Sequence, residues 1–316
     1  MLLLTLLASA AIDTVEIKEW TVPWERTRPR DTYVAPDGRV WFVGQTGHYI
    51  ASLDPATGQF RRIDLEPGAG PHNLIVDAKG IVWYAGNRSA YIGRVDPATS
   101  EIKRFTMPDS MARDPHTLVF GPSGEIWFTV QGGGYVGRFN PASGRTDLIK
   151  APERSRPYGI VVDSKGVPWV DLFAAGKIAT VDPKTMTLRE FALPAGARPR
   201  RIALTSDARV WYVDFARGFL SRLDPATGEV REWATPGGTT SRPYAMTVDD
   251  RDRIWFVETG PSPNTLVGFD PKTEQFFSVT KIPSGGGAVR HMVYHPATKA
   301  IWFGTDANTI GRAIIR

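Results

Sequence analysis

The chain has 316 residues and a formal net charge of +5 at pH 7, and 42% of its residues are hydrophobic. It contains no cysteine, which excludes disulfides and thiolate-bound metals. Lys and Arg are scattered through turns without forming runs, so we expect no nucleic-acid binding, although an anionic small molecule is compatible with the positive charge.

The first eleven residues are an apolar run that ends in small residues, Ala8-Ser9-Ala10. This pattern is typical of a secretory signal peptide, and the run is too short to span a membrane. We therefore expect residues 1–11 to be a signal peptide and the protein to be periplasmic or secreted. If Met1 is misassigned as the start, a cytoplasmic protein is the alternative.

Seven of the ten tryptophans recur at intervals of 42 to 47 residues along the remaining chain. They are Trp41, Trp83, Trp127, Trp169, Trp211, Trp255 and Trp302. A constant period of this size indicates one supersecondary unit copied along the chain, and such units bury a core only by stacking on each other. We therefore expect residues 12–316 to form a single domain and the protein to be a monomer.

Each copy predicts four short strands. A turn containing Pro leads into an apolar strand, a second strand carries the tryptophan, a third follows, and an Asp-Pro turn such as Asp96-Pro97 introduces the fourth. Four strands in about 42 residues are typical of a β-propeller blade. The predicted fold is therefore all-β, a seven-bladed propeller.

The two ends of the chain predict how the ring closes. The seventh copy stops after its third strand, at residues 309–315, whereas residues 15–23 resemble an isolated fourth strand. We expect this N-terminal segment to complete the last blade, which would remove the exposed strand edges.

Function is expected where the copies differ. The start of the first strand and the end of the second should open on the same face, around the central channel. Eleven residues before each tryptophan the sequence carries mostly Arg, His and Tyr, and in the seventh copy either of two residues fits. The members of this ring are Arg30, His72, His116, Tyr158, Arg200, Tyr244 and either Arg290 or His291. Convergent polar side chains in a concave place predict a binding site.

His72 and His116 occupy equivalent positions in neighbouring copies, and Asp114 lies two residues before His116. Such a group can supply a general base near neutral pH or hold a metal ion. The alternative is that each histidine only hydrogen-bonds a turn carbonyl.

The recurring Pro-(His/Tyr), Trp-Phe and Ile-Gly-Arg segments resemble those of the virginiamycin B lyase (streptogramin lyase) family, from about Val15 onward. The resemblance implies a seven-bladed propeller that opens a cyclic depsipeptide lactone by elimination, aided by Mg²⁺, and so inactivates an antibiotic. It implies that His116 is the catalytic base, which takes the proton alpha to the ester carbonyl.

The resemblance also implies that His72 contacts the substrate, as we expect of Arg30, Tyr158, Arg200, Tyr244 and Arg290 at the same channel opening. Asp114 and Gln131 fall where the family has its two metal-binding glutamates. A neutral amide is a poorer ligand for Mg²⁺ than a carboxylate.

Two other functions remain open. An exported, non-catalytic propeller could bind an anionic ligand or act as a sensor, since arginines bind carboxylates well. A metal-dependent lactonase would need acidic and amide ligands from several blades, for which Glu258, Asp214 and Asn87 are the candidates.

Overall fold

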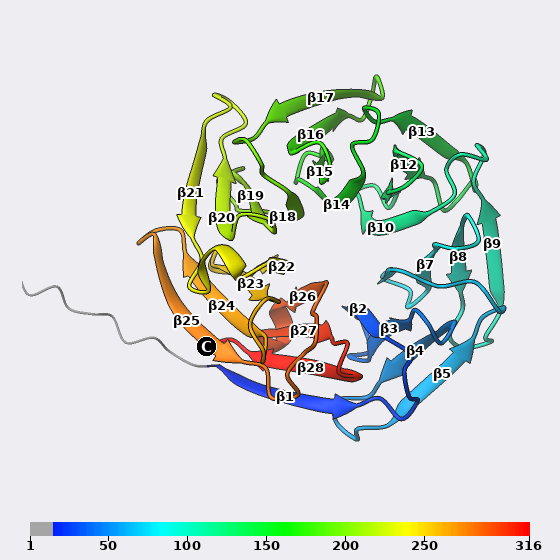
Figure 1. The fold of residues 1–316 in the computed structure, drawn as a ribbon. Coiled ribbons are helices and arrows are strands. Elements are labelled where there is room, and N and C mark those ends of the chain that lie inside the picture. The colour runs from blue at the N-terminus through cyan, green and yellow to red at the C-terminus, as the bar shows by residue number, and fades with distance from the viewer. Residues whose placement is uncertain (1–14) are drawn as a thin grey trace, which may run out of the picture.

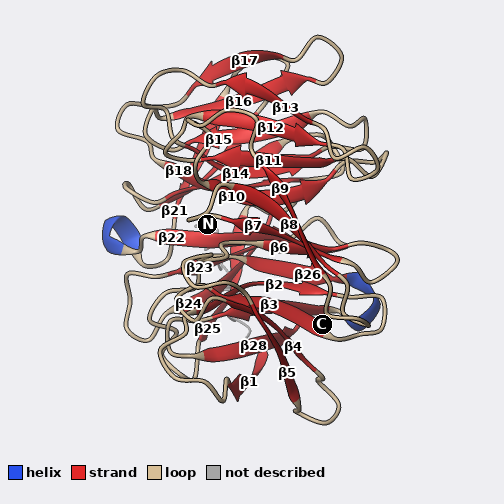
Figure 2. Ribbon diagram, turned by 90° about the vertical axis from the view of Figure 1, so that its right-hand side faces the viewer, coloured by secondary structure: helices blue, strands red, loops and turns tan. Residues whose placement is uncertain are grey.

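A computed structural model describes residues 15–316 and confirms a ring of seven four-stranded antiparallel sheets, the blades of a β-propeller (Figure 1). The predicted signal peptide lies outside the described residues. Seen from the side, the described part of the molecule consists of strands and the loops that connect them, with only two short helical turns (Figure 2). The helical segments of residues 15–316 are two 3-10 turns, Gly238–Thr240 and Pro296–Thr298, and no helix there is long and apolar enough to span a bilayer.

Six blades each use four consecutive strands, numbered from the channel to the rim. The first two blades are β2 (Pro29–Val34), β3 (Val40–Gly44), β4 (Tyr49–Leu53), β5 (Phe60–Asp64), β6 (Leu74–Val76), β7 (Val82–Gly86), β8 (Tyr91–Val95) and β9 (Ile102–Thr106). The next two are β10 (Pro115–Phe120), β11 (Ile126–Val130), β12 (Tyr135–Phe139), β13 (Thr146–Lys150), β14 (Pro157–Val162), β15 (Pro168–Leu172), β16 (Lys177–Asp182) and β17 (Thr187–Ala192). The fifth and sixth are β18 (Pro199–Leu204), β19 (Val210–Asp214), β20 (Phe219–Leu223), β21 (Val230–Ala234), β22 (Pro243–Val248), β23 (Ile254–Glu258), β24 (Thr265–Asp270) and β25 (Gln275–Lys281).

The seventh blade joins the two ends of the chain, as predicted. Its strands from the channel outward are β26 (Met292–His295), β27 (Ala300–Gly304), β28 (Thr309–Ile314) and β1 (Glu16–Thr21). The pairing of β1 with β28 is continuous from Glu16 opposite Ile314 to Thr21 opposite Thr309. Figure 1 shows the blue first strand along the red last one. This pairing covers the outer edge of β28 and gives the last blade the same four strands as the others, so the two ends of the chain close the ring.

The repeated tryptophans all lie on the second strand of a blade, where they pack between neighbouring sheets. Trp127, Trp211 and Trp255 are among the largest fully buried side chains. The arginine of the Ile-Gly-Arg segments lies on the third strand opposite the tryptophan, as Arg312 does opposite Trp302, with its guanidinium 5.7 Å from the ring centroid. The hydrophobic core is correspondingly divided into layers between adjacent blades.

The inner strands are irregular where they begin. In five blades the pairing of the first and second strands shifts within the first few residues of the inner strand, as between Pro115 and Leu118. Such bulges redirect side chains. At these positions they present polar groups to the channel in place of the regular alternation of a strand.

Candidate functional site at the channel

The predicted ring of polar residues comes together at one opening of the channel. We call this opening the polar mouth and define it by His72, His116, Tyr158, Arg200 and Tyr244. Each belongs to the start of an inner strand or to the residues just before it, next to the end of the second strand of its blade. The expected ring is thus present, although two of its arginines are occupied by internal partners.

His72 and His116 lie against each other. Their ring centroids are 3.6 Å apart, and both side chains are buried. Burial, followed by the positive charges of Arg30 and Arg201, holds the pKa of each imidazole well below its usual value of 6.5. Both histidines are therefore neutral at pH 7.

The hydrogen bonds of the two imidazoles assign different tautomers to them. His72 Nδ1 lies 3.1 Å from the carbonyl oxygen of His116, which can only accept, so His72 Nδ1 carries the proton and Nε2 keeps a free lone pair. His116 Nδ1 lies 2.9 Å from Thr117 Oγ1, and that hydroxyl already accepts a bond from Arg201 Nη1 at 3.0 Å. The hydroxyl proton is therefore best donated to His116 Nδ1, which places the imidazole proton on Nε2.

A cationic and aromatic cluster forms the other side of the polar mouth. The hydroxyls of Tyr158 and Tyr244 are hydrogen-bonded to each other, and the Arg200 guanidinium lies 4.1 Å from the Tyr244 ring centroid and 4.2 Å from that of Phe215. Burial and the neighbouring Tyr244 raise the pKa of Tyr158 to about 12. Burial would also raise the pKa of Tyr244, but Arg200 and two further arginines lower it below its usual value. Tyr244 is thus the more acidic of the two phenols.

The middle of the channel is closed by a buried ionic network, which we call the septum. Asp31 is fully buried and accepts bonds from Arg30 Nε and Asn73 Nδ2, both at 2.9 Å, and Arg201 Nη2 lies 3.6 Å from its second oxygen. Burial alone would raise the pKa of Asp31, but Arg30 and then His291 and Arg201 hold it well below its usual value. Arg30 is thus committed to Asp31 and does not face the mouth as a free substrate ligand.

The comparison of copies in the sequence did not predict the septum, although the polar residues that form it occupy equivalent positions. Apart from Arg30, its members lie one residue further along the inner strands than the predicted ring. Seven residues share this register, namely Asp31, Asn73, Thr117, Gly159, Arg201, Ala245 and His291. The same comparison of copies, moved by one residue, would have found a second polar ring.

The seventh copy settles which of its two candidates faces the channel. The Arg290 side chain turns to an ion pair with Asp306, and its backbone carbonyl accepts a bond from Arg201 Nε at 2.8 Å. His291 instead lines the channel. Arg290 therefore contributes a carbonyl to the channel, whereas its guanidinium is held by a neighbouring loop.

Neither of the two predicted metal ligands is well suited to bind a metal ion. Asp114 accepts the backbone N–H groups of Gly132, at 2.6 Å, and Gly133, at 2.9 Å, one with each carboxylate oxygen. Gln131 offers a neutral amide. Within residues 15–316 no group of three or more His, Cys, Asp or Glu side chains could share a metal ion. This donor set does not fit Mg²⁺, which prefers several oxygen ligands in a near-octahedral arrangement.

The residues considered for a lactonase are also engaged in local structure. Asp214 accepts from the backbone N–H of Arg198, and Glu258 accepts from that of Gly237 and from the Thr265 hydroxyl. Asn87 donates to a backbone carbonyl of the next blade, that of Pro115, at 2.9 Å. The side chains act as turn caps and as ties between neighbouring blades.

The model of the virginiamycin B lyase family matches residues 15–313, which is most of the chain. The chain belongs to the virginiamycin B lyase family. No curated protein is significantly similar to it in sequence.

Solved structures agree on the fold. The virginiamycin B lyase of Staphylococcus aureus is 23% identical, with a TM-score of 0.85 over 95% of this chain and 99% of that one. A streptogramin B lyase is also 23% identical, with a TM-score of 0.86 over 98% of this chain and 100% of that one. A catalytically inactive histidine-to-alanine variant of the S. aureus enzyme was solved with quinupristin. The hydrazine synthase of Kuenenia stuttgartiensis, at 14% identity and a TM-score of 0.77, shares the architecture as well, so the fold of this virginiamycin B lyase family member does not by itself decide its chemistry.

Proposed function

We propose that this chain is a carbon–oxygen lyase that opens a cyclic, ester-containing substrate of the streptogramin B type by elimination at the polar mouth. Membership of the virginiamycin B lyase family supports the reaction class. The observation that carries the proposal is the pair of neutral imidazoles in close contact and with opposite tautomers, His72 and His116. An elimination needs one group that takes a proton and another that donates to the carbonyl oxygen, and this pair offers both.

The hydrogen bonds favour a division of roles different from the one implied by the resemblance. His72 Nε2 holds the free lone pair and acts as the base, which removes a proton from the carbon next to a carbonyl group. The electron pair forms a carbon–carbon double bond while the bond from the adjacent carbon to the ester oxygen breaks. His116 Nε2–H donates to the carbonyl oxygen, where negative charge develops.

The cationic and aromatic cluster suits the product. The ester oxygen leaves as a carboxylate, and Arg200, held over aromatic rings, provides a positive charge at the polar mouth. The rings of Tyr158 and Phe215 provide apolar contact area for a hydrophobic cyclic peptide. The family's chemistry includes Mg²⁺, but no step is assigned to it, because Asp114 and Gln131 do not fit the ion.

Mass spectrometry after incubation of the full chain with a streptogramin B lactone tests the proposal. Elimination gives a linear product of unchanged mass, whereas hydrolysis adds the mass of one water. His72→Ala should lower the rate by about 10²- to 10⁴-fold, the usual range for a general base, with little change in melting temperature. Added imidazole should restore part of the activity of His72→Gly.

The roles of the two histidines are separable by substitution to asparagine, which donates but is no base. His116→Asn should keep measurable activity, whereas His72→Asn should lose it. The reverse result would return the base to His116. A wild-type chain that leaves the lactone intact would refute the lyase proposal altogether.

A binding or sensor function is the second candidate, and the arginine held among aromatic rings at the polar mouth favours it. Arg200 is charged, largely buried and raised in pKa by the two tyrosines despite its desolvation. Stabilisation of the chain by small carboxylates, lost in Arg200→Gln and unaccompanied by any product, would support this function.

A further inference from the structure

The channel contains a second site on the other side of the septum from the polar mouth. A cavity of about 410 Å³ is lined by all seven inner strands. This volume lies in the usual range of small-molecule sites, about 300–1,000 Å³. We call it the apolar pocket, and it shares no lining residue with the polar mouth as defined above.

Aliphatic side chains form the walls of the apolar pocket. Val119, Val161, Leu204 and Val293 line it from four different blades. All four side chains are only half-buried and so keep surface for a ligand, whereas the neighbouring Ile160, Met246 and Met292 are buried in the layers between blades. No lysine and no acidic residue lines the pocket. The walls therefore suit an uncharged hydrocarbon or aromatic group.

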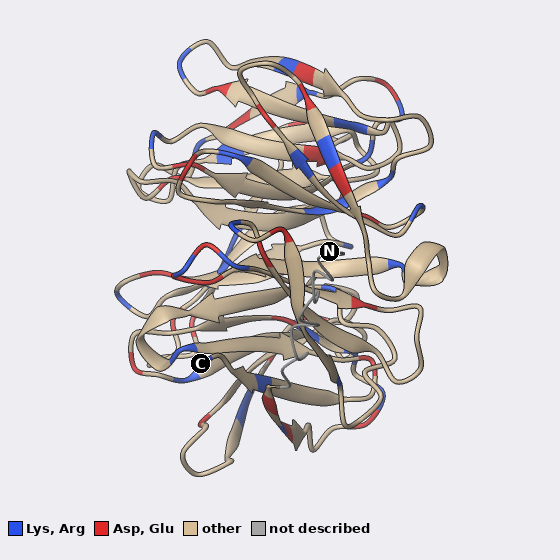
Figure 3. Ribbon diagram, turned by 90° about the vertical axis from the view of Figure 1, so that its left-hand side faces the viewer, with Lys and Arg blue, Asp and Glu red and all other residues tan. Residues whose placement is uncertain are grey.

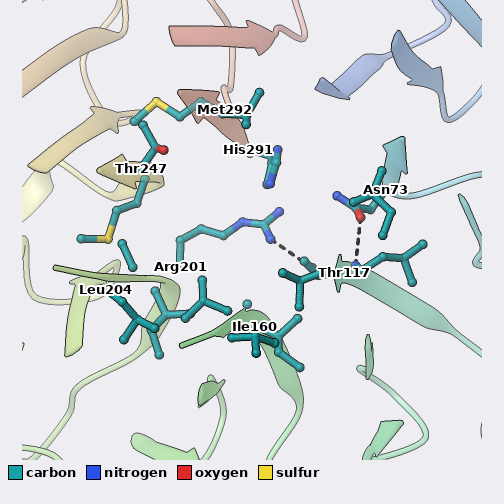
Figure 4. Close-up of a pocket in the computed structure, with 18 of the residues that line it drawn as sticks. Asn73, Thr117, Ile160, Arg201, Leu204, Thr247, His291 and Met292 are labelled. Carbon is teal, nitrogen blue, oxygen red and sulfur yellow. Dashed lines mark hydrogen bonds between the residues drawn. The ribbon is translucent and has the colours of Figure 1, made fainter. Parts of the chain in front are cut away.

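The floor of the pocket is the guanidinium of Arg201, which reaches across the channel from β18 toward β10 (Figure 4). Arg201 Nε donates to the Arg290 carbonyl and Nη1 donates to Thr117 Oγ1. Arg201 Nη2, in contrast, is buried without a hydrogen-bond acceptor among residues 15–316, since Asp31 lies 3.6 Å away. A charged donor left without an acceptor is costly, so this nitrogen requires a partner.

His291 provides a second unused polar atom beside Arg201 (Figure 4). Its Nδ1 is buried and has no hydrogen-bond partner within the described residues. Burial outweighs the attraction of Asp31 and lowers the pKa of His291 to about 4, so the imidazole is neutral at pH 7 and carries one N–H. The floor thus offers a guanidinium and a neutral imidazole.

We propose that the apolar pocket binds a monocarboxylate with an aliphatic or aromatic tail. The carboxylate oxygens accept bonds from Arg201 Nη2 and from His291 Nδ1–H, while the tail lies among Val119, Val161, Leu204 and Val293. The proposal is independent of the chemistry assigned to the polar mouth.

The charges of the floor favour one carboxylate over other anions. Asp31 is a single carboxylate between Arg30 and Arg201, so the septum has one positive charge more than it has negative ones. One monoanion completes this balance. A phosphate dianion would bring a second charge and would find no lysine or further guanidinium along the apolar walls.

Isothermal titration of the full chain with octanoate tests the site. We expect saturable binding that weakens at least tenfold in Arg201→Gln. Acetate has the charge without the tail and octan-1-ol has the tail without the charge, so both should bind at least tenfold more weakly than octanoate. Arg200→Gln is the matched control, since it removes the adjacent arginine that serves the polar mouth, and it should leave octanoate binding unchanged.

Leu204→Glu provides a test that leaves the septum intact, in case Arg201→Gln does not fold. A carboxylate on the half-buried wall should weaken octanoate binding at least tenfold, whereas Leu204→Met should bind like wild type. Absence of saturable binding, or equal affinity in wild type and Leu204→Glu, would overturn the proposal. Loss of binding in Arg200→Gln alone would place the ligand at the polar mouth and would overturn it as well.

Discussion

The two ends of the channel are built from the same seven strands but have opposite chemistry. At the polar mouth the first residues of the inner strands supply imidazoles, phenols and a guanidinium, whereas a few residues later the same strands supply the aliphatic walls of the apolar pocket. The bulges at the strand starts allow this change within about two residues. Chemistry in this propeller is therefore decided by position along a strand as much as by blade.

The septum separates the two ends of the channel but also links them through hydrogen bonds and ion pairs. Arg201 donates to Thr117, which in turn hydrogen-bonds His116 of the polar mouth, while its remaining nitrogen borders the apolar pocket. Asp31 anchors this arginine and Arg30. A ligand bound at either end should thus change the affinity of the other end for its ligand through the orientation of Arg201. Substitutions in the septum should impair both ends together.

Asp31→Asn should have the largest effect. It leaves Arg30 and Arg201 buried without their anion, and breaking a buried ion pair in this way costs about 3–5 kcal/mol. Urea denaturation should show this loss, and the variant should also lose activity at the polar mouth and octanoate binding in the apolar pocket. Asp64→Asn is the control, because Asp64 is an exposed partner of Arg62 and should lose less than about 1 kcal/mol. A septum variant as stable as this control would show that the two ends do not depend on Asp31.

Acid should destabilise the fold through the channel histidines. A histidine with a lowered folded-state pKa binds fewer protons when folded than when unfolded, so stability falls as pH drops below about 6.5, the unfolded value. For His291, whose folded pKa is about 4, the loss between pH 6.5 and 4 is up to about 3 kcal/mol. His72 and His116 act in the same direction.

Urea denaturation of His72→Gln and His291→Gln across this pH range would show how much of the acid destabilisation comes from each end of the channel. Each variant should show a flatter profile than wild type. An unchanged profile in both would mean that the imidazoles are not the groups that protonate on unfolding.

Asp114→Ala should have a moderate effect confined to the polar mouth. It removes two hydrogen bonds from a carboxylate to the hairpin at Gly132 and Gly133, worth about 1–2 kcal/mol at a partly exposed position. Mg²⁺ should not change the melting temperature of wild type or of this variant. Stabilisation of wild type by Mg²⁺ that Asp114→Ala abolishes would instead restore the metal site implied by the family resemblance.

The propeller fold was predictable from the sequence because the same core residues recur in every blade. Each tryptophan packs between blades, and in four blades an arginine of the third strand lies opposite it, so the spacing of the repeats in the sequence matches the spacing of the core layers. The closing strand was predictable as well, since residues 15–23 share the pattern of the fourth strands. The pairing of His72 with His116 followed from aligned positions in neighbouring copies.

The partners of each polar side chain were not predictable in this way. Arg30 and Arg200 occupy equivalent positions, but one is bound to Asp31 and the other lies over aromatic rings. Asp114 caps a hairpin, which its spacing from His116 did not show. The septum depends on contacts across the channel, such as Arg201 with Thr117, between residues 84 apart in sequence. Only the closed ring brings these groups together.

Asp171→Asn should have the smallest effect and an opposite dependence on pH. Asp171 is fully buried beside Gly159, one of whose N–H bonds it accepts at 3.0 Å, and its other oxygen has no partner within residues 15–316. Burial raises the pKa of this carboxyl well above 3.8, although Arg201 opposes the shift. The folded state therefore binds the proton more tightly than the unfolded state, and this group lowers stability as pH rises above about 3.8.

Asparagine has the shape of the neutral acid and cannot ionise, so Asp171→Asn should match wild type at low pH and exceed it at pH 8, by about 1 kcal/mol. Urea denaturation at the two pH values measures the difference. A clear loss of stability at pH 8 would mean that Asp171 is ionised and paired with Arg201. The septum would then have no unbalanced positive charge, and the apolar pocket would lack its reason to prefer an anion over an uncharged ligand.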